Sequence, residues 1–278
     1  MKLANKFGIV AFAFAAACGG DKGEVTLEEG KTYEPFADER FTVLGSDGEG
    51  DPLSGSAQVG AGQCLRVGDL CITPEEARAG CANGDGPVDF VLVDGQLSRT
   101  LCYGDPAAAT QVVQNGSGSI NVPQTNNNAI LTFDPSTNGQ PIQGDLSVDG
   151  NNVTIYGNGP DNTVIDGNVV ITSNNTRIRG VTIRGNVRLA FNDLSIVLSR
   201  VLGNIEIVGN NATVAANTVF GNIQSATNNH VIVDNAVNGS IQTTGQNAVC
   251  EGNVRFSDDN GNSIADPEER GAALACGG

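Results

Sequence analysis

Apolar side chains recur along the second half of the chain with a period of 18 residues. Each repeat begins at a glycine. Columns rich in Val, Ile and Leu follow at the second, fourth, eleventh and sixteenth positions after it, and an Asn column at the seventh. The glycines that open the repeats are Gly167, Gly185, Gly203, Gly221 and Gly239. A short fixed period of this kind is typical of solenoids, in which every repeat is one turn of a coil.

The period of 18 residues is too short for a pair of helices and suits two or three short strands. A single coil cannot bury its own Ile and Val, but stacked coils bury them as ladders about 4.8 Å apart. We expect the Asn column to be internal at a turn, where the stacked side chains bond neighbouring backbone and the amides above and below. We expect the glycines to make a bend that a β-carbon would obstruct. Left-handed β-helices need an aliphatic residue at every sixth position, which this pattern lacks.

The sequence therefore predicts an all-β fold, a right-handed parallel β-helix (a β-solenoid of 18-residue coils) over residues 112–256, with a β-sandwich as the alternative. One inward column that should stack in a single file comprises Ile178, Ile196, Val214 and Ile232. Two outward columns are apolar, one with Val197, Ala215 and Val233 and the other with Leu202 and Phe220. Because apolar stripes usually mark a covered surface, we expect the disulfide-rich segment or the C-terminal tail to lie over them.

The remaining residues divide into four segments by composition. These are an export signal at 1–17, an acidic Gly-rich tether at 18–60, a small disulfide-rich segment at 61–106 and a C-terminal cap at 257–278. We expect a short strand near 41–44 in the tether. In the disulfide-rich segment, Thr73 followed by Pro74 predicts the start of a short helix. Two strands around Asp94-Gly95 predict a hairpin.

The seven cysteines divide into Cys18 and six others, an even number that predicts disulfides in an exported chain. The six are Cys64, Cys71, Cys81, Cys102, Cys250 and Cys276. The simplest division pairs the four clustered cysteines among themselves, with three pairings open, and joins Cys250 to Cys276 across the end of the solenoid. Zinc is the alternative, but the spacings lack a short C-x₂-C and the only His is distant.

The N-terminal segment combines Lys2 and Lys6 with an apolar run that is too short to span a bilayer. Its end, "AAAC" up to Cys18, resembles the lipobox of bacterial lipoproteins, with Ala15 in place of the usual Leu. The resemblance implies that Cys18 is lipidated, and Gly19 after it favours the outer membrane. We therefore expect lipid anchoring in a bacterial outer membrane, facing the periplasm or the cell surface. An ordinary secretory signal is the alternative.

The net charge of −16 and the pI near 4.2 make the chain strongly acidic. An acidic surface repels phosphate backbones, so nucleic acid is excluded as a partner and divalent cations are favoured. The stretch "DDNGNSIADPEE" resembles the isolated calcium loops of bacterial surface proteins. The resemblance implies a structural Ca²⁺ site, with Ser263 where a glycine is usual. Its ligands would be Asp258, Asn260, Asn262, Ile264 through its carbonyl, Asp266 and Glu269. An acidic Asn-Gly turn leading to a helix that starts at Pro267 is the alternative.

The repeats from "NNVTIYGNGP" to "VTIRGN" resemble the right-handed parallel β-helices of pectate-lyase-like proteins, and the short coils resemble those of envelope proteins. Enzymes of that family use carboxylates and an Arg on one outer face. Here the nearby residues are Arg177, Arg179, Arg184, Arg188, Asp161 and Asp166. Four consecutive repeats carry no insertion to shape a cleft, no catalytic set is evident, and His230 falls in a column expected to be packed.

We therefore expect a non-catalytic scaffold, adhesin or carbohydrate-contacting surface, with a polysaccharide or an envelope protein as its partner. A polysaccharide lyase or glycoside hydrolase of the pectate-lyase-like type is the alternative.

Overall fold

The computed structural model describes residues 23–25, 28–29, 40–45, 55–59, 63–67, 70–79, 81, 86–114 and 116–277. The predicted export signal and Cys18 lie outside these residues.

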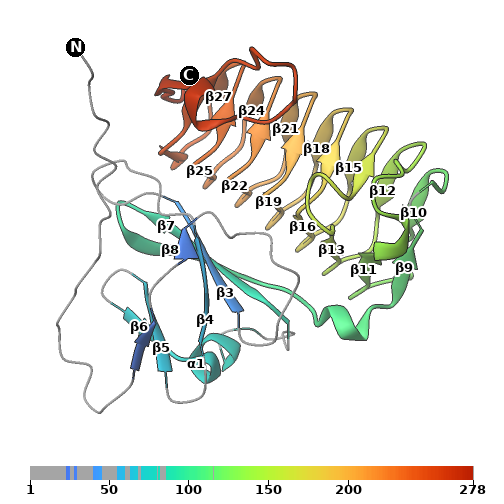
Figure 1. The fold of residues 1–278 in the computed structure, drawn as a ribbon, viewed down its shortest axis with the longest axis horizontal. Helices are drawn as coiled ribbons and strands as arrows, with labels where there is room; N and C mark the ends of the chain where they lie inside the picture. The colour runs from blue at the N-terminus through green and yellow to red at the C-terminus, as the bar shows by residue number, and fades with distance from the viewer. Residues whose placement is uncertain are drawn as a thin grey trace.

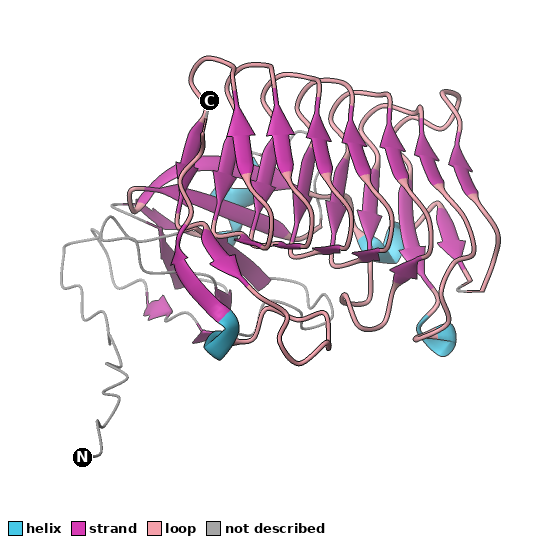
Figure 2. Cartoon of the chain, turned by 90° about the horizontal axis from the view of Figure 1, so that it is seen from above, coloured by secondary structure: helices cyan, strands magenta, loops and turns pink. Residues whose placement is uncertain are grey.

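Three stacks of short strands form a right-handed parallel β-helix (Figure 1). The chain visits three sheets in turn, and each sheet gains one strand per coil. Figure 2 shows these strands following one another along a single axis. We name the sheets the covered sheet, the open sheet and the short-strand sheet.

The covered sheet has eight parallel strands: β9 (Gln111–Val113), β11 (Ile130–Phe133), β13 (Thr154–Tyr156), β16 (Arg177–Arg179), β19 (Ser195–Val197), β22 (Thr213–Ala215), β25 (Val231–Val233) and β28 (Val249–Glu251). The open sheet has seven: β10 (Ile120–Val122), β12 (Leu146–Val148), β15 (Val169–Ile171), β18 (Val187–Leu189), β21 (Ile205–Ile207), β24 (Ile223–Ser225) and β27 (Ile241–Thr243). The short-strand sheet contains β14 (Val164–Ile165), β17 (Thr182–Ile183), β20 (Arg200–Val201), β23 (Thr218–Val219), β26 (Ala236–Val237), β29 (Val254–Phe256) and the antiparallel β30 (Arg270–Ala273).

Inward side chains stack in vertical files, as the sequence predicted. Direct Cα pairing joins Ile178 to Ile196, Ile196 to Val214 and Val214 to Ile232. All four side chains are 0% exposed. The file belongs to one continuous aliphatic core that runs from the first coil to the last.

The glycine column is required by the closeness of successive coils. A β-carbon built on Gly203 would lie 2.5 Å from the carbonyl oxygen of Gly185 and 2.6 Å from Oδ1 of Asn186. The other repeat-opening glycines meet the equivalent atoms at similar distances. The predicted obstruction is therefore confirmed.

The predicted Asn column forms a ladder, but it lies at a half-buried or exposed turn and not inside the coil. The backbone N–H of Asn192 donates to Oδ1 of Asn174 at 3.2 Å, and that of Asn210 donates to Oδ1 of Asn192 at 2.9 Å. The following residue has positive φ in each coil, for example 55° at Asn175. The tight turn places the amide outside the aliphatic core.

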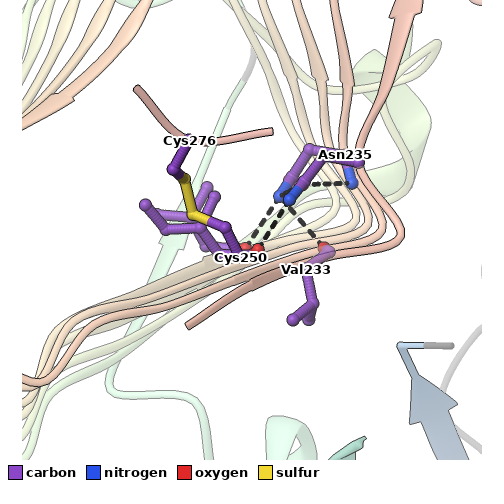
Figure 3. The surroundings of a disulfide bond; sticks show 7 residues. Val233, Asn235, Cys250 and Cys276 are labelled. Carbon is purple, nitrogen blue, oxygen red and sulfur yellow. Dashed lines mark hydrogen bonds between the residues drawn. A yellow bond between two sulfur atoms is a disulfide. The ribbon is translucent and has the colours of Figure 1, made fainter. Parts of the chain in front are cut away.

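A second, fully buried ladder lies between the covered and short-strand sheets. Asn217 and Asn235 are 2% and 0% exposed. Nδ2 of Asn235 donates to the carbonyl of Val233 (Figure 3). It also donates to the carbonyl of Val214, while Oδ1 accepts the N–H of Asn217 at 3.0 Å. These side chains satisfy backbone groups at a turn where strand pairing is interrupted.

A smaller body precedes the solenoid. Its five-stranded sheet has the order β2 (Glu28–Glu29), β4 (Gly55–Gln58), β3 (Arg40–Leu44), β7 (Val88–Val93) and β8 (Gln96–Cys102). Its three-stranded sheet contains β1 (Gly23–Val25), β5 (Gln63–Val67) and β6 (Leu70–Ile72), and its helix is α1 (Pro74–Ala79). The described residues also contain the 3₁₀ helices η1 (Pro106–Ala108), η2 (Pro135–Thr137) and η3 (Pro267–Glu269).

The predicted helix start and hairpin are both present. Thr73 Oγ1 accepts the N–H of Glu76 at 3.2 Å, and the Glu76 carboxylate accepts the N–H of Thr73 at 3.0 Å. The hairpin β7–β8 turns at Asp94 and Gly95, which have φ values of 50° and 69°. The disulfides Cys64–Cys71 and Cys81–Cys102 resolve the pairing that the sequence left open.

Strands β1 to β4 come from residues 18–60, where the sequence predicted a solvated tether with one short strand. Phe41 and Val43 on β3 are 3% and 1% exposed, and the Phe41 ring meets Phe90 at 5.5 Å between centroids. Only β3 carried an apolar signal, because its neighbours are held by backbone pairing and have few apolar side chains of their own. This part of the chain therefore contributes to the folded body.

The hairpin β7–β8 covers the apolar outer face of the covered sheet. Val197, Ala215 and Val233 are each 0% exposed and cluster with Val91 and Leu101 of the hairpin. At the hairpin tip, the N–H of Asp94 donates to Glu251 at 2.7 Å. The expectation that the disulfide-rich segment covers this stripe is confirmed.

A buried ion pair fixes the smaller body to the solenoid. Nε of Arg179 on β16 lies 3.1 Å from Oδ2 of Asp89 on β7, and the side chains are 7% and 0% exposed. The same oxygen accepts the hydroxyl of Tyr103 at 2.7 Å, and Nη2 of Arg179 donates to Thr42 Oγ1 at 3.1 Å. Burial and the Asp89 charge raise the pKa of Tyr103, which keeps it a donor. Among the described residues Asp89 Oδ1 has no hydrogen-bond partner. The negative charge of this buried carboxylate is compensated by the ion pair that Arg179 makes with Oδ2.

The C-terminal residues close the last coil. Strand β30 pairs antiparallel with β29, Gly277 bridges to Gln242, and Cys250 forms the predicted disulfide with Cys276 (Figure 3). The outward Phe220 packs edge-on against Phe256 at 5.1 Å, beside Ala265 of the tail. Tail residues thus cover part of the second apolar column.

Two matched substitutions test the buried ion pair. Arg179→Val introduces valine, which is the residue at the equivalent position of the next coil, Val197. The substitution leaves the buried charge of the Asp89 carboxylate without a partner. We expect it to lower the free energy of unfolding by about 3–5 kcal/mol. Arg188→Val, which breaks an exposed pair beside Val170, should cost less than about 1 kcal/mol.

Urea unfolding monitored by circular dichroism measures both changes. Adding Asp89→Asn to Arg179→Val should recover much of the loss, because the buried charge is then removed. Equal costs for the two arginine variants would contradict the assignment.

Candidate functional site

The outer face of the open sheet is polar and accessible along five coils. Its central outward column comprises Val170, Arg188, Glu206, Gln224 and Gln242. The side chains of Arg188 and Glu206 are 47% and 50% exposed, Gln224 and Gln242 are exposed, and Val170 is half-buried. The face is therefore a flat array of long polar side chains.

A ladder of exposed or half-buried Asn borders this column on the side where each coil begins. The N–H of Asn204 donates to Oδ1 of Asn186 at 2.9 Å, and the N–H of Asn222 donates to Oδ1 of Asn204 at 2.8 Å. These bonds hold the amides in a row along the margin of the sheet.

The charged groups of the face cancel. Arg188 Nη1 contacts Glu206 Oε2 across adjacent strands. Such an exposed pair adds little to stability. It leaves the central column with no net charge, in a chain whose net charge is −16.

Two apolar side chains lie exposed at the opposite margin of the open sheet. Phe191 follows β18 and is 44% exposed, and Val208 follows β21 and is 37% exposed. Successive coils stack tightly here, since a β-carbon on Gly209 would meet the Phe191 carbonyl oxygen at 1.7 Å. The sequence prediction missed them. The sequence signal that could have indicated this exposed site is Phe191 itself, an aromatic residue in a turn column. The other members of that column are small or polar: Ser173, Gly209, Thr227 and Gly245.

The arginines that resemble those of pectate-lyase-like enzymes do not converge. Arg179 is buried against Asp89, whereas Arg188 lies on the open sheet with Glu206. Two further pairs lie along the short-strand sheet: Arg184 with Asp166 at 3.2 Å and Arg200 with Asp161 at 3.0 Å. The remaining candidate arginine, Arg177, is half-buried on the covered sheet. Each of the four paired arginines is held by a carboxylate, and the predicted acid and base residues share no common point.

His230 is packed inside the coil, as expected. It is 0% exposed, its Nδ1 accepts the N–H of Ala212 at 3.3 Å, and its Nε2 lies 3.0 Å from Thr227 Oγ1. The Thr227 hydroxyl donates to the Gly209 carbonyl at 2.8 Å, so Nε2 carries the proton and donates to Thr227. Burial lowers the pKa of His230 below its ordinary 6.5, and the imidazole is neutral.

The six residues of the predicted calcium loop lie at one turn, where they bond to each other and to backbone. Oδ2 of Asp266 accepts from Nδ2 of Asn260 at 2.9 Å and of Asn262 at 2.8 Å, and these bonds lower its pKa. Glu269 accepts backbone N–H groups from Asp259 at 3.0 Å and Asn260 at 3.2 Å. Asp258 accepts the N–H of Ser263 at 3.3 Å.

The donor set of this loop suits a hard cation, since it offers carboxylate and amide oxygens. The amide nitrogens of Asn260 and Asn262, however, point at Asp266. Ser263, at φ 61°, adopts the conformation for which calcium loops use glycine. Ca²⁺ binding therefore requires both Asn side chains to turn, and the site stays a prediction.

Comparison with family models, with curated proteins and with solved structures found no match. Within the described part of the chain, no helix is long and apolar enough to cross a membrane. The same residues contain no group of three or more His, Cys, Asp and Glu side chains arranged to hold a metal ion.

The buried His230 predicts a pH dependence of stability. Its pKa is lower in the folded chain than in the unfolded chain, so the unfolded state binds the proton more readily. Stability is complete above about pH 6.5 and falls as the pH drops below it. We expect His230→Leu, which copies Leu194 of the same column, to remove this component.

Urea unfolding of both proteins from about pH 7.5 to about pH 5 measures the effect. Carboxylates titrate alike in both proteins, so the difference between the curves isolates the imidazole. Parallel curves would contradict a neutral buried His230.

If the loop binds Ca²⁺, we expect millimolar Ca²⁺ to raise the Tm of the wild-type chain. Millimolar affinity is usual for extracellular calcium sites. We also expect no such shift for Asp258→Asn combined with Asp266→Asn, because two of the carboxylate ligands are then lost. Differential scanning calorimetry with Ca²⁺, and with Mg²⁺ as control, measures both. An unchanged wild-type Tm would show that the loop closes without an ion.

Proposed function

We propose that this chain is a lipid-anchored protein of a bacterial outer membrane, facing the periplasm or the cell surface. Its solenoid then serves as a non-catalytic scaffold whose open sheet contacts polysaccharide. The observation that carries the proposal is the accessible, insertion-free outer face of the open sheet, with polar side chains in register on consecutive coils. Such a face suits an extended polymer better than a small molecule, which needs a concave pocket.

The N-terminal resemblance supports the anchoring part of the proposal. The sequence up to Cys18 looks like a lipoprotein signal, and the acyl chains of a lipoprotein give stable membrane attachment. Three disulfides accord with export to an oxidising compartment. The buried ion pair between Asp89 and Arg179 supports a scaffold role, because it joins the smaller body and the solenoid into one unit.

A polysaccharide lyase or hydrolase of the pectate-lyase-like type is the alternative function. One observation favours it: the coil with extra residues, near Asp161, brings a carboxylate to Arg200 on the short-strand sheet. The same ion pair weighs against it, since an arginine held by a carboxylate is not free to act as a base. An adhesin or a docking surface for an envelope protein uses the same rigid face without chemistry.

Expression in a bacterial host tests anchoring. The wild-type chain should fractionate with outer membranes and enter the detergent phase, whereas Cys18→Ser should stay in the aqueous phase. All four lysines lie within residues 1–31, so a lysine-specific protease should release the rest of the chain from washed membranes. Aqueous partitioning of the wild-type protein would contradict the lipid anchor.

Polysaccharide sedimentation combined with product analysis tests the non-catalytic role. The soluble Cys18→Ser chain should co-sediment with insoluble polysaccharide and release neither reducing ends nor unsaturated products. Product release would decide for the enzyme, and failure to bind any polysaccharide would contradict the carbohydrate-contacting function.

A further inference from the structure

The chain covers one of its apolar outer columns and part of a second with its own residues but leaves a third apolar feature exposed. The hairpin β7–β8 buries Val197, Ala215 and Val233, and Phe220 packs against Phe256 of the last coil, beside Ala265 of the tail. Phe191 and Val208, at the margin of the open sheet, remain 44% and 37% exposed. Exposed aromatic and aliphatic side chains beside polar groups are typical of a binding surface.

The polar groups beside this margin are suited to hydroxyl groups. Arg188 and Glu206 provide a donor and an acceptor on adjacent strands, and Gln224 adds an exposed amide. The Asn ladder lines the other side of the same strands. A sugar ring combines an apolar C–H face with a rim of hydroxyls, so its two kinds of surface match the margin and the central column.

Charge selects among possible polymers. The central column of the open sheet carries one positive and one negative group, which pair with each other. The chain as a whole has a net charge of −16, so a polyanion is repelled at long range. An uncharged polyhydroxyl chain meets no such barrier and loses no counterions on binding.

Spacing selects the direction of that polymer. Adjacent strands lie about 4.8 Å apart, close to the rise of one pyranose unit in an extended β-1,4-linked glycan. A glycan that runs along the solenoid axis therefore presents one sugar to each coil.

We propose that the open sheet binds a neutral, extended β-1,4-linked glycan along the solenoid axis, with a sugar ring on Phe191 and Val208 and hydroxyls on Arg188, Glu206 and Gln224. This inference rests on the proposed polysaccharide-contacting function and names its site and ligand class.

The experiment uses the full mature chain with Cys18→Ser and microcrystalline cellulose as the probe. Co-sedimentation isotherms should show binding, and Phe191→Ala should weaken it at least about tenfold, as expected for an aromatic anchor. Arg188→Ala combined with Glu206→Ala should weaken it without a change in Tm, because both side chains are exposed. Val112→Ala is the matched control, since Val112 is 61% exposed on the covered sheet and should leave binding unchanged.

The other outcomes each overturn the inference. Cellulose binding that survives Phe191→Ala places the site elsewhere, and preference for polygalacturonate rejects a neutral ligand; in both cases the proposed function stands. Affinity that appears only after lysine-specific cleavage assigns the face to the chain's own N-terminal residues. Binding to no polysaccharide overturns the inference and the proposed function together.

Discussion

Registered stacking of successive coils is the constraint on which the rest of the structure depends. Coils that approach this closely leave no room for a β-carbon at Gly203, and they align each aliphatic residue above its equivalent. Backbone groups left without strand partners at the turns must then be met by side chains at the same period. The Asn ladders, including the buried one through Asn217 and Asn235, meet this requirement. Glycine, aliphatic and Asn columns are thus three consequences of one repeat distance.

The same regularity explains which parts of the fold were predictable. Inward columns such as that of Ile196 follow from periodicity, because a solenoid repeats its sequence with its structure. The body before the solenoid has no repeat, and its edge is held by backbone pairing, since β2 pairs with β4 and β4 pairs with β3. Their Gly-rich and acidic sequences resemble a linker for that reason. The ion pair between Asp89 and Arg179 joins residues 90 positions apart, and no local pattern encodes such a contact.

The sequence could predict that polar side chains point outward from the open sheet, but not which residues of this face form the candidate site. Alternation along strands places Arg188 and Glu206 outward, and the 18-residue period makes them neighbours. The exposure of Phe191 depends on what else covers the surface, which the sequence does not state. Tertiary packing removed Val197 from solvent and left Phe191 exposed, although both are apolar. A binding surface on a solenoid is therefore defined as much by what the chain covers as by what it displays.

The hairpin β7–β8 lies across the covered sheet from β13 to β28. At one end, Tyr103 contacts Tyr156 of β13, and at the tip the N–H of Asp94 donates to Glu251 of β28. The seven residues of β8 extend about 23 Å, which matches five coil steps of about 4.8 Å. The length of the hairpin therefore matches the distance over which these coils must stack. Its last contact, between Asp94 and Glu251, spans 157 residues and forms only when all the intervening coils have stacked. A chain with one coil deleted or duplicated should then fold its repeats yet lose this contact, because the length of the hairpin matches the number of coils between Tyr156 and Glu251.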